Sequence, residues 1–475
     1  MDRLRTSTRT LVIAVLLAAG VPLAPPPVQA QTILTVGPDG NFTSIQSAID
    51  AVVVGANTEI RIQGGGLTFS ENLDIPNSFT SGSLLVRGGW NTTFTVPSND
   101  PEDSIVNGGG SRVIDIAPGG GTLEIRGLTF TNGSAQQGAG VHVAPVGNPV
   151  ITLRDCLIAE NTATAAGDTL GGGLWAILIG TQELEIADCS FLQNQSTSTS
   201  GGLANAGGAG IIASESSRVA IRRTEFIENH VGTTGAGSSG GGLLLELSNT
   251  AEADLEDCLF YGNTGTNSQA TVLGTGSWIS TQDSAVLRAT RDIWALNEGV
   301  GTDTGPQCGS SLQGQSSMTL REAGIVHGDS DGLMVSVQST SVAHLTNLTV
   351  ADNQGFGLDL TEQGGAATLT LYNTISYSNG TDLSQTGTVD ADFNLIGVDP
   401  LFLDPSDFDY HLRIGSPAEN AGTNSPPGGL SSLDLDGNSR IQDGIVDIGA
   451  LEGIAEIFID GFESGNTTAW SRTVP

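Results

Sequence analysis

The sequence contains no lysine: all 17 of its basic residues are arginines, and they face 51 aspartates and glutamates, for a formal net charge of -34. Such a surface repels phosphate backbones and anionic lipid headgroups, so nucleic acids and membrane surfaces are disfavoured as partners. The same self-repulsion keeps a protein soluble and predicts a monomer.

Long apolar runs are also missing, because no segment beyond the N-terminus reaches the roughly 18 apolar residues of a transmembrane helix. Residues 1–30 have the features of a signal peptide. Three arginines precede an apolar run from Leu11 to Ala19, and Val28-Gln29-Ala30 has the small-x-small form of a cleavage site. A buried N-terminal helix is the alternative. We expect the mature chain to begin near Gln31 and to be secreted or held at the outer envelope of a bacterium.

Common metal and phosphate motifs are absent. The five histidines are dispersed, which predicts no zinc site, and the glycine runs lack a following GK[ST] and are expected to be bends. Asp434, Asp436 and Asn438 have the alternate oxygens of a Ca²⁺ loop. Ser439 stands where an EF-hand needs glycine, however, and Ile445 where it needs glutamate. We expect a turn there, with Ca²⁺ as the alternative, and no other cofactor.

What the sequence does contain is one recurring pattern, apolar-x-apolar-x-x-small-x-apolar-x-x-Asn. Clear copies run from Ile151, Leu184, Val219, Ala253, Ala343 and Leu369, and weaker copies end at Asn132 and Asn297. Successive asparagines lie 29, 33, 35, 34, 34, 56 and 26 residues apart from Asn132 to Asn379. A fixed period of this size indicates a solenoid.

Apolar residues alternate within each copy, so the segments are expected to be strands with one face inward. A two-residue break, such as Arg154-Asp155, lets the chain bend into a second strand, and a third strand follows a glycine cluster such as Gly171–Gly173. Three strands and three bends per period predict an all-β fold: a right-handed, single-stranded parallel β-helix with three sheets. A helical-repeat solenoid is disfavoured because the segments lack a 3.6-residue period.

The recurrent asparagine is expected to form a structural ladder. Its amide can bond the backbone of a bend and the equivalent amide one coil away, at about 4.8 Å along the axis. The predicted ladder comprises Asn132, Asn161, Asn194, Asn229, Asn263, Asn297, Asn353 and Asn379.

The four cysteines divide into two groups. Cys156, Cys189 and Cys258 share one inward register, where we expect small core residues, with a Cys156–Cys189 disulfide as the alternative. Cys308 lies off this register and is expected in a glycine-rich loop, in an undetermined redox state.

A solenoid needs its ends covered. Thr43–Val53 predicts an N-terminal helical cap, with Thr43 and Gln46 as a capping box.

The repeats resemble those of bacterial right-handed β-helix proteins related in fold to pectate lyases. Phe191–Asn194, Phe226–Asn229 and Phe260–Asn263, alternating with Gly-Gly-Gly-Leu, also resemble the FxxN and GGA[I/L] repeats of polymorphic outer-membrane proteins. The stretch from Asp399 to Glu452 is similar to a C-terminal module of surface-directed β-helix proteins that precedes anchoring or sorting signals. Ile459–Ser471 looks like a terminal tag of exported Gram-negative proteins.

These features divide the chain into five parts. We expect a signal peptide at 1–30, the N-terminal cap and first coils at 31–120, and the β-helix repeats at 121–395. An anchor-associated module is expected at 396–453 and a sorting tail at 454–475.

The resemblance implies that any active groove runs along one sheet, and the strand after each glycine cluster is a candidate. Aligning these strands predicts an outward column of His142, Trp175, Ile212, Leu244, Met334 and Asp359, which Trp278 joins. A second outward column is predicted to hold Ala144, Ile177, Ser214, Glu246, Ser280, Ser336 and Thr361.

The predicted columns argue against catalysis. Lyases and glycosidases of this fold need clustered carboxylates. The columns offer only Glu246 and Asp359, several coils apart, as weak catalytic candidates. Arg154-Asp155, Glu256-Asp257 and Arg321-Glu322 lie elsewhere and are expected to be solvated surface pairs.

The first column instead predicts a ligand-binding stripe made by His142, Trp175, Trp278 and Met334, on which sugar rings could stack. The alternative is that the loops inserted into each repeat fold over the stripe and bury it.

The leading functional hypothesis is an exported, non-catalytic protein that binds an extracellular polysaccharide or a surface protein. A polysaccharide lyase or glycoside hydrolase, and an adhesin without its own membrane barrel, are the alternatives.

Overall fold

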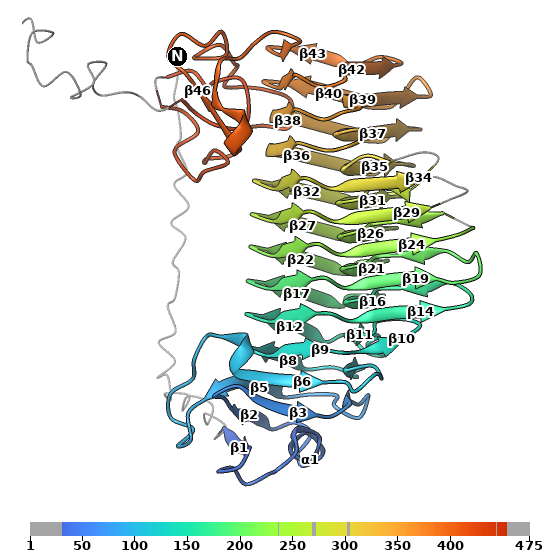
Figure 1. The fold of residues 1–475 in the computed structure, drawn as a ribbon, viewed down its shortest axis with the longest axis vertical. Helices are drawn as coiled ribbons and strands as arrows, with labels where there is room; N and C mark the ends of the chain where they lie inside the picture. Colours follow the sequence, from blue (N-terminus) through green and yellow to red (C-terminus); the bar gives the residue numbers. More distant parts are fainter. Residues whose placement is uncertain (1–30, 236, 268–271, 302–304, 443, 454–475) are drawn as a thin grey trace, which may run out of the picture.

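The computed structural model describes residues 31–235, 237–267, 272–301, 305–442 and 444–453. The predicted signal peptide and the predicted sorting tail therefore lie outside the described residues. The described chain is an all-β solenoid of parallel strands (Figure 1), which confirms the predicted fold class. Its described helices include none that is long and apolar enough to cross a membrane.

One coil illustrates how the sequence pattern becomes structure. The alternating segment forms β12 (Val150–Arg154), the chain bends, and β13 (Leu157–Ala159) follows. After Asn161 an excursion forms β14 (Thr162–Ala165) and β15 (Thr169–Leu170), and the glycine cluster then leads into β16 (Leu174–Leu178). The next coil repeats this order directly above.

Corresponding strands of successive coils pair in register and form three stacks around the core. The first stack contains β1 (Thr32–Val36), β2 (Asn57–Gln63), β5 (Ser83–Trp90), β8 (Thr122–Arg126), β12, β17 (Glu183–Ala187), β22 (Arg218–Arg222), β27 (Glu252–Glu256), β32 (Val286–Thr290), β36 (Ser317–Val326), β38 (Val342–Ala351), β40 (Thr368–Tyr372) and β43 (Asp390–Asp392). The second stack contains β3 (Leu67–Ser70), β6 (Ser104–Asn107), β9 (Thr129–Thr131), β13, β18 (Ser190–Leu192), β23 (Glu225–Ile227), β28 (Leu259–Tyr261), β33 (Ile293–Ala295), the second halves of β36 and β38, β41 (Ile375–Tyr377) and β44 (Leu395–Ile396). The third stack contains β4 (Leu73–Ile75), β7 (Ile114–Ile116), β11 (Val141–Val143), β16, β21 (Ala209–Ala213), β26 (Leu243–Leu247), β31 (Ser277–Thr281), β35 (Cys308–Leu312), β37 (Leu333–Gln338), β39 (Phe356–Gln363) and β42 (Thr381–Thr386).

The inserted excursions form two further stacks that the sequence did not predict. One contains β10 (Ser134–Ala135), β14, β19 (Gln195–Ser198), β24 (His230–Thr233), β29 (Thr264–Asn267) and β34 (Glu298–Gly301). The other contains β15, β20 (Ala204–Asn205), β25 (Ser238–Ser239) and β30 (Val272–Leu273). Both lie outside the continuous apolar core.

The core is built from in-register apolar columns. Phe191, Phe226, Phe260 and Trp294 stack at ring-centroid distances of 4.9–5.0 Å with nearly parallel planes. Cys156, Cys189 and Cys258 are buried and free in their predicted inward register. Cys308 lies off this register, as predicted, but the expected loop is wrong: Cys308 begins β35, pairs with Leu333 and is buried.

The asparagine ladder runs through the middle of the solenoid. Asn161, Asn194, Asn229, Asn263 and Asn297 are fully buried. Each Nδ2 from Asn161 to Asn263 donates to the next Oδ1 at 2.9–3.0 Å. Asn353 and Asn379 form the same contact at 2.9 Å.

Two details of the ladder correct the sequence prediction. Asn132 does not join it: its backbone is left-handed at φ 56°, its side chain is exposed, and Gly133 occupies the ladder position. Gln307 spans the 56-residue gap instead, since its Oε1 accepts from Asn297 at 3.1 Å and its Nε2 donates to Asn353 at 2.6 Å.

The N-terminal cap is the helix α1 (Ile45–Asp50), shorter than predicted. Ser44, not Thr43, is the N-cap, and its side chain accepts from the Ser47 amide. Gln46 does not close a capping box; it bonds Asp50 and the backbone of Asp74.

The segment that follows the last coil packs on the side of the solenoid, next to β36 and β38 (Figure 1). It contains the antiparallel pair β45 (Phe402–Asp404) and β46 (Asp409–Leu412). Phe402, Tyr410 and Leu451 bury against Val326 and Ala351 of the coils. We call residues 397–453 the lateral segment.

Replacing Asn229 with alanine tests the ladder. The change removes contacts to Asn194, Asn263 and the Phe191 carbonyl and leaves buried backbone groups without partners. We expect a loss of about 1–3 kcal/mol in the free energy of unfolding, measured by chemical denaturation. Gln195→Ala, an exposed position one coil below, is the control and should leave stability within about 0.5 kcal/mol. Equal effects of the two changes would contradict a structural ladder.

Asp292 predicts a pH dependence. It occupies the inward register of the cysteines, is fully buried, and its Oδ2 has no hydrogen-bond partner among the described residues. Burial raises its pKa to about 7. The unfolded chain therefore loses this proton first, and the protein loses stability as the pH rises from about 4 to about 7.

Asp292→Asn, which mimics the protonated acid, should remove this loss and raise the melting temperature at pH 8 more than at pH 5. Asp359→Asn, at a half-buried position, is the control for the removal of one carboxylate. If the melting temperature of Asp292→Asn depended on pH in the same way as that of the wild type, the pH dependence could not be assigned to Asp292.

Candidate functional site

The outward face of the third stack was the first candidate site, and its register differs from the prediction. Trp175 pairs with Gly210 and Gly210 with Leu244, so Ile212 belongs to the second column beside Glu246. Ser214 falls outside the column altogether. The pairing also adds Gly309 between Trp278 and Met334.

Trp175 is buried, with 3% of its surface exposed. It packs with Ala206 and Leu244, and with Leu170 of the excursion strand β15. Its ring lies against Gly210, where any added Cβ would overlap the indole. The excursions therefore cover this part of the stripe, and Trp175 is not available as a sugar platform.

The other members of the stripe do not gather into one surface. Trp278 is half-buried with its ring over Gly309, and Met334 lies two coils after Trp278. His142 lies three coils before Leu244, and its Nδ1 contacts Asp115 Oδ1 at 3.0 Å. The described strands of the third stack therefore form no continuous aromatic stripe.

Glu246 and Asp359 remain apart, as predicted. Four coils separate their strands, which corresponds to about 19 Å along the axis. That separation exceeds the 5–9.5 Å range of paired glycosidase carboxylates. Burial raises the pKa of Glu246, but no second carboxylate stands beside it in the column.

The loop at Asp434 is a turn held by that residue. Asp434 Oδ1 accepts from the amides of Asp436 and Asn438, and Oδ2 accepts from the amide of Glu452. The carboxylate thus serves the backbone, which favours the turn over Ca²⁺ binding. Within the described ranges no three His, Cys, Asp or Glu side chains are grouped to hold a metal ion.

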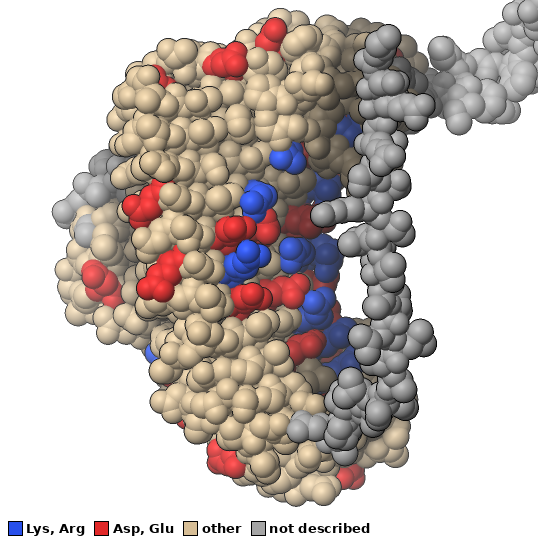
Figure 2. All heavy atoms as spheres, turned by 180° about the vertical axis from the view of Figure 1, so that it is seen from behind, with Lys and Arg blue, Asp and Glu red and all other residues tan. Residues whose placement is uncertain are grey.

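The first stack presents a more organised surface, whose side chains change sign from coil to coil (Figure 2). We call it the charged face and define it by four consecutive coils. The acidic coils contribute Glu183, Glu185 and Asp188, and then Glu252, Asp254, Glu256 and Asp257; the basic coils contribute Arg218, Arg222 and Arg223, and then Arg288 and Arg291. If every coil carried the same charges, parallel in-register stacking would place like charges next to one another, and they would repel. Because acidic and basic coils alternate, neighbouring side chains attract one another instead.

The ion pairs of the charged face fall into two classes. Those at the bends are short: Arg223 Nε to Asp188 and Arg291 Nε to Asp257 each measure 2.6 Å. The bend residues adopt left-handed backbone conformations that are costly for arginine, and these contacts hold them there.

Along the strands the ion pairs are looser. Arg222–Glu185 measures 3.6 Å, Arg218–Glu252 3.9 Å and Arg288–Asp254 3.3 Å. Arg218 is 64% exposed. These groups therefore retain hydrogen-bonding capacity toward a ligand.

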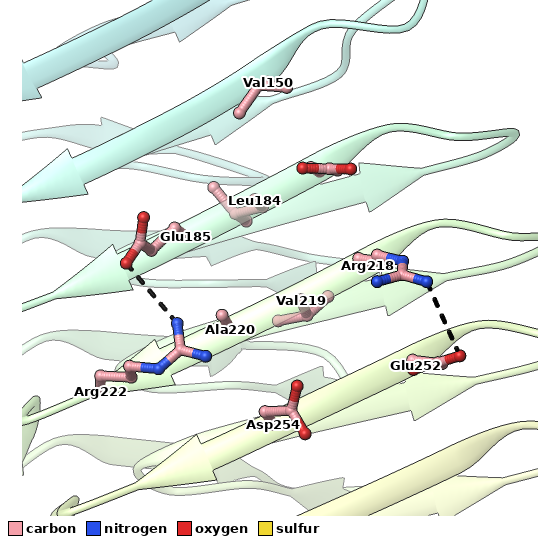
Figure 3. A pocket seen from close by; sticks show the side chains of 10 residues that line it. Val150, Leu184, Glu185, Arg218, Val219, Ala220, Arg222, Glu252 and Asp254 are labelled. Carbon is pink, nitrogen blue, oxygen red and sulfur yellow. Dashed lines mark ion pairs between the residues drawn. The ribbon is translucent and has the colours of Figure 1, made fainter.

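A hollow of about 230 Å³ interrupts the charged face (Figure 3). It exists because Ala220 occupies the position that carries Glu185 one coil below and Asp254 one coil above. Arg218, Arg222 and Glu252 complete its polar rim, and Glu183, Val150, Leu184 and Val219 also line it.

The chemistry of the hollow is that of a mixed donor and acceptor surface. Guanidinium groups only donate hydrogen bonds and carboxylates only accept them. Seven acidic and five basic side chains give the charged face a formal charge of -2, in a chain of -34. The face is therefore far less repulsive than the average surface of this protein.

The sequence showed the charged residues of this face but not which of them lie next to one another. Arg154-Asp155 was recognisable as a pair of opposite charge and Glu256-Asp257 as a pair of like charge. The partners that matter lie about 34 residues away, one coil above or below, and only the in-register pairing identifies them.

The comparison with protein-family models agrees with the fold. A family model described as a right-handed beta helix region matches residues 102–292. The crystal structure of pectate lyase Pel9A is 11% identical with a TM-score of 0.44, over 90% of this chain and 97% of that chain. A pectin methylesterase from Aspergillus niger is 12% identical with a TM-score of 0.29, over 80% of this chain and 94% of that chain. A comparison with curated protein sequences gave no match.

Trp175→Ala distinguishes a covered stripe from an open one. Because Trp175 is enclosed by the excursions, its truncation should cost about 3–5 kcal/mol of unfolding free energy, as large buried truncations do. Asp359→Ala, in the same column but half-buried and polar, should change stability by about 0.5 kcal/mol or less. Denaturant unfolding of both variants measures the difference. An unchanged free energy of unfolding for Trp175→Ala would support the hypothesis that Trp175 is exposed and available to stack on a sugar ring.

Proposed function

We propose that this chain is a non-catalytic binding protein for a neutral, hydroxyl-rich polysaccharide, which lies along the charged face and enters the hollow over Ala220. The observation that carries the proposal is the alternation of donor and acceptor coils around that hollow. Sugar hydroxyl groups both donate and accept, so each can bond a guanidinium on one coil and a carboxylate on the next.

Charge favours a neutral polymer over an ionic one. A polyanion would meet the seven carboxylates of the charged face and the acidic remainder of the protein. A polycation would find stronger sites elsewhere on so acidic a surface. A polymer without charge makes use of both side-chain types and pays no electrostatic penalty.

The arrangement of the carboxylates supports binding rather than turnover. Glu185 and Asp254 flank the hollow two coils apart, and each contacts an arginine. Both carboxylates are thus engaged by arginines, whereas a glycosidase uses its carboxyl pair as an acid and a base or nucleophile on the bound sugar. Hydrolysis by these two residues is therefore the second candidate, and the experiment below includes it.

We further propose that the protein acts outside the cytoplasm. The predicted signal peptide at 1–30 would direct export, and the lateral segment with the tail at 454–475 would retain the protein at the envelope. A surface protein that carries a hydroxyl-rich glycan could bind to the charged face in the same way.

Ala220→Trp tests the proposal by filling the hollow from its floor. The side chain points outward, so stability should change by about 0.5 kcal/mol or less. Binding to immobilised neutral polysaccharides should fall at least about tenfold. Thr319→Trp, which lies in the same column three coils above, is the matched control and should bind as wild type does.

Three results would decide against the proposal. Unchanged binding by Ala220→Trp would exclude the hollow as the binding site. Tighter binding of polyuronates than of neutral polymers would contradict the argument that charge favours a neutral polymer. Release of reducing ends by wild type that stops in Glu185→Gln would establish the hydrolase instead.

A further inference from the structure

A second cavity lies between the lateral segment and the side of the solenoid, independent of the charged face. Its volume is about 320 Å³, which falls in the range of small-molecule sites. Ile293, Gly324 and Thr349 form the floor from three successive coils of the second stack. The lateral segment forms the opposite wall with Tyr410, Phe408, Leu435 and Leu451.

Gly324 accounts for the space. Its column carries Leu259 and Ile293 in the two coils below and Thr349 in the coil above. A Cβ added at Gly324 would meet only Leu435 Cδ2, at 3.4 Å. The cavity therefore results from a missing side chain in an otherwise filled column, not from a poor fit between two surfaces.

The polar groups of the cavity gather at one side. His411 bridges two carboxylates, with Nδ1 to Asp409 Oδ1 and Nε2 to Asp436 Oδ2 both at 2.8 Å. Asp407 lines the same cavity and is exposed. Three carboxylates thus stand against one imidazole, and the rim is negative in either protonation state of His411.

His411 fixes the shape of this rim. Burial lowers its pKa, but the hydrogen bonds and charges of Asp409 and Asp436 outweigh that effect and raise the pKa above its usual value. The bridge joins β46 to the loop at Asp434–Asn438, so both carboxylates are held in place before a ligand arrives.

We propose that this cavity binds a small amphiphilic cation, an apolar group that carries one ammonium. The hydrocarbon walls would enclose the apolar body, and the ammonium would contact the carboxylate oxygens of Asp409 and Asp436 that His411 leaves open. An anionic ligand of the same size is repelled by the rim, and an uncharged one adds no ionic partner for the carboxylate oxygens that His411 leaves open.

The test uses the full chain and two probes that differ in the sign of the head group. Phenethylamine should bind saturably, and phenylacetate should bind at least about tenfold more weakly. Calorimetry or ligand-observed magnetic resonance measures both. Equal affinity for the two probes, or no binding of the amine, would overturn the proposal.

Two variants locate the binding. Gly324→Leu fills the cavity with a side chain like those of its column and should reduce amine affinity at least about tenfold without lowering the melting temperature. Asp436→Asn removes one negative charge from the rim. It should lower the affinity for phenethylamine and reduce the difference in affinity between phenethylamine and phenylacetate. Amine binding that survives both changes would place the ligand elsewhere and reject the site.

Ala220→Trp provides the control that separates the two proposals. It fills the distant hollow of the charged face, so it should leave amine binding unchanged. Loss of amine binding in Ala220→Trp would contradict an independent site.

Discussion

The rest of this structure depends on the in-register stacking of parallel coils at about 4.8 Å. That register places each residue directly above its counterpart in the neighbouring coil, so every side chain must suit its own copies. Flat aromatic rings satisfy this condition by stacking, and Phe191, Phe226 and Phe260 do so at about 5 Å. Amides satisfy it by donating to one neighbour and accepting from the other, as Asn194, Asn229 and Asn263 do.

Charged residues cannot satisfy this condition with copies of themselves, and the charged face shows the solution. Acidic and basic coils alternate, so that Arg218, for example, pairs with Glu183 in the coil below and with Glu252 in the coil above. The short pairs at the bends hold left-handed residues such as Arg223 and Arg291, whereas the looser pairs along the strands surround the hollow at Ala220. The fold and the proposed binding thus use different arginines of the same face: Arg223 and Arg291 at the bends, Arg218 and Arg222 at the hollow.

Glycine has the opposite role, since it opens space where a column would otherwise be filled. Gly210 and Gly309 accept the indole rings of Trp175 and Trp278, and Gly324 leaves the cavity beneath the lateral segment. A buried cluster fastens that segment to the coils. Arg440, 1% exposed, contacts Glu452 at 3.2 Å, and Ser431 donates to the buried Glu322 of β36. Burial raises the pKa of Glu452 to about 7, although the charge of Arg440 acts to lower it.

The sequence by itself determined the alternating strands and the bends, because these follow from residues close together in the chain. It also determined the period and the ladder from Asn161 to Asn297, because the same pattern recurs at a nearly constant spacing. It misplaced Asn132, Ile212, Ser214 and Cys308, because glycine-rich excursions of variable length hide how one coil aligns with the next. Only the tertiary structure decided which outward residues are covered and which charges meet. Burial of Trp175 by β15, the hollow at Ala220 and the cavity at Gly324 all arise between segments of different coils, where side-chain packing, and not local pattern, sets the outcome.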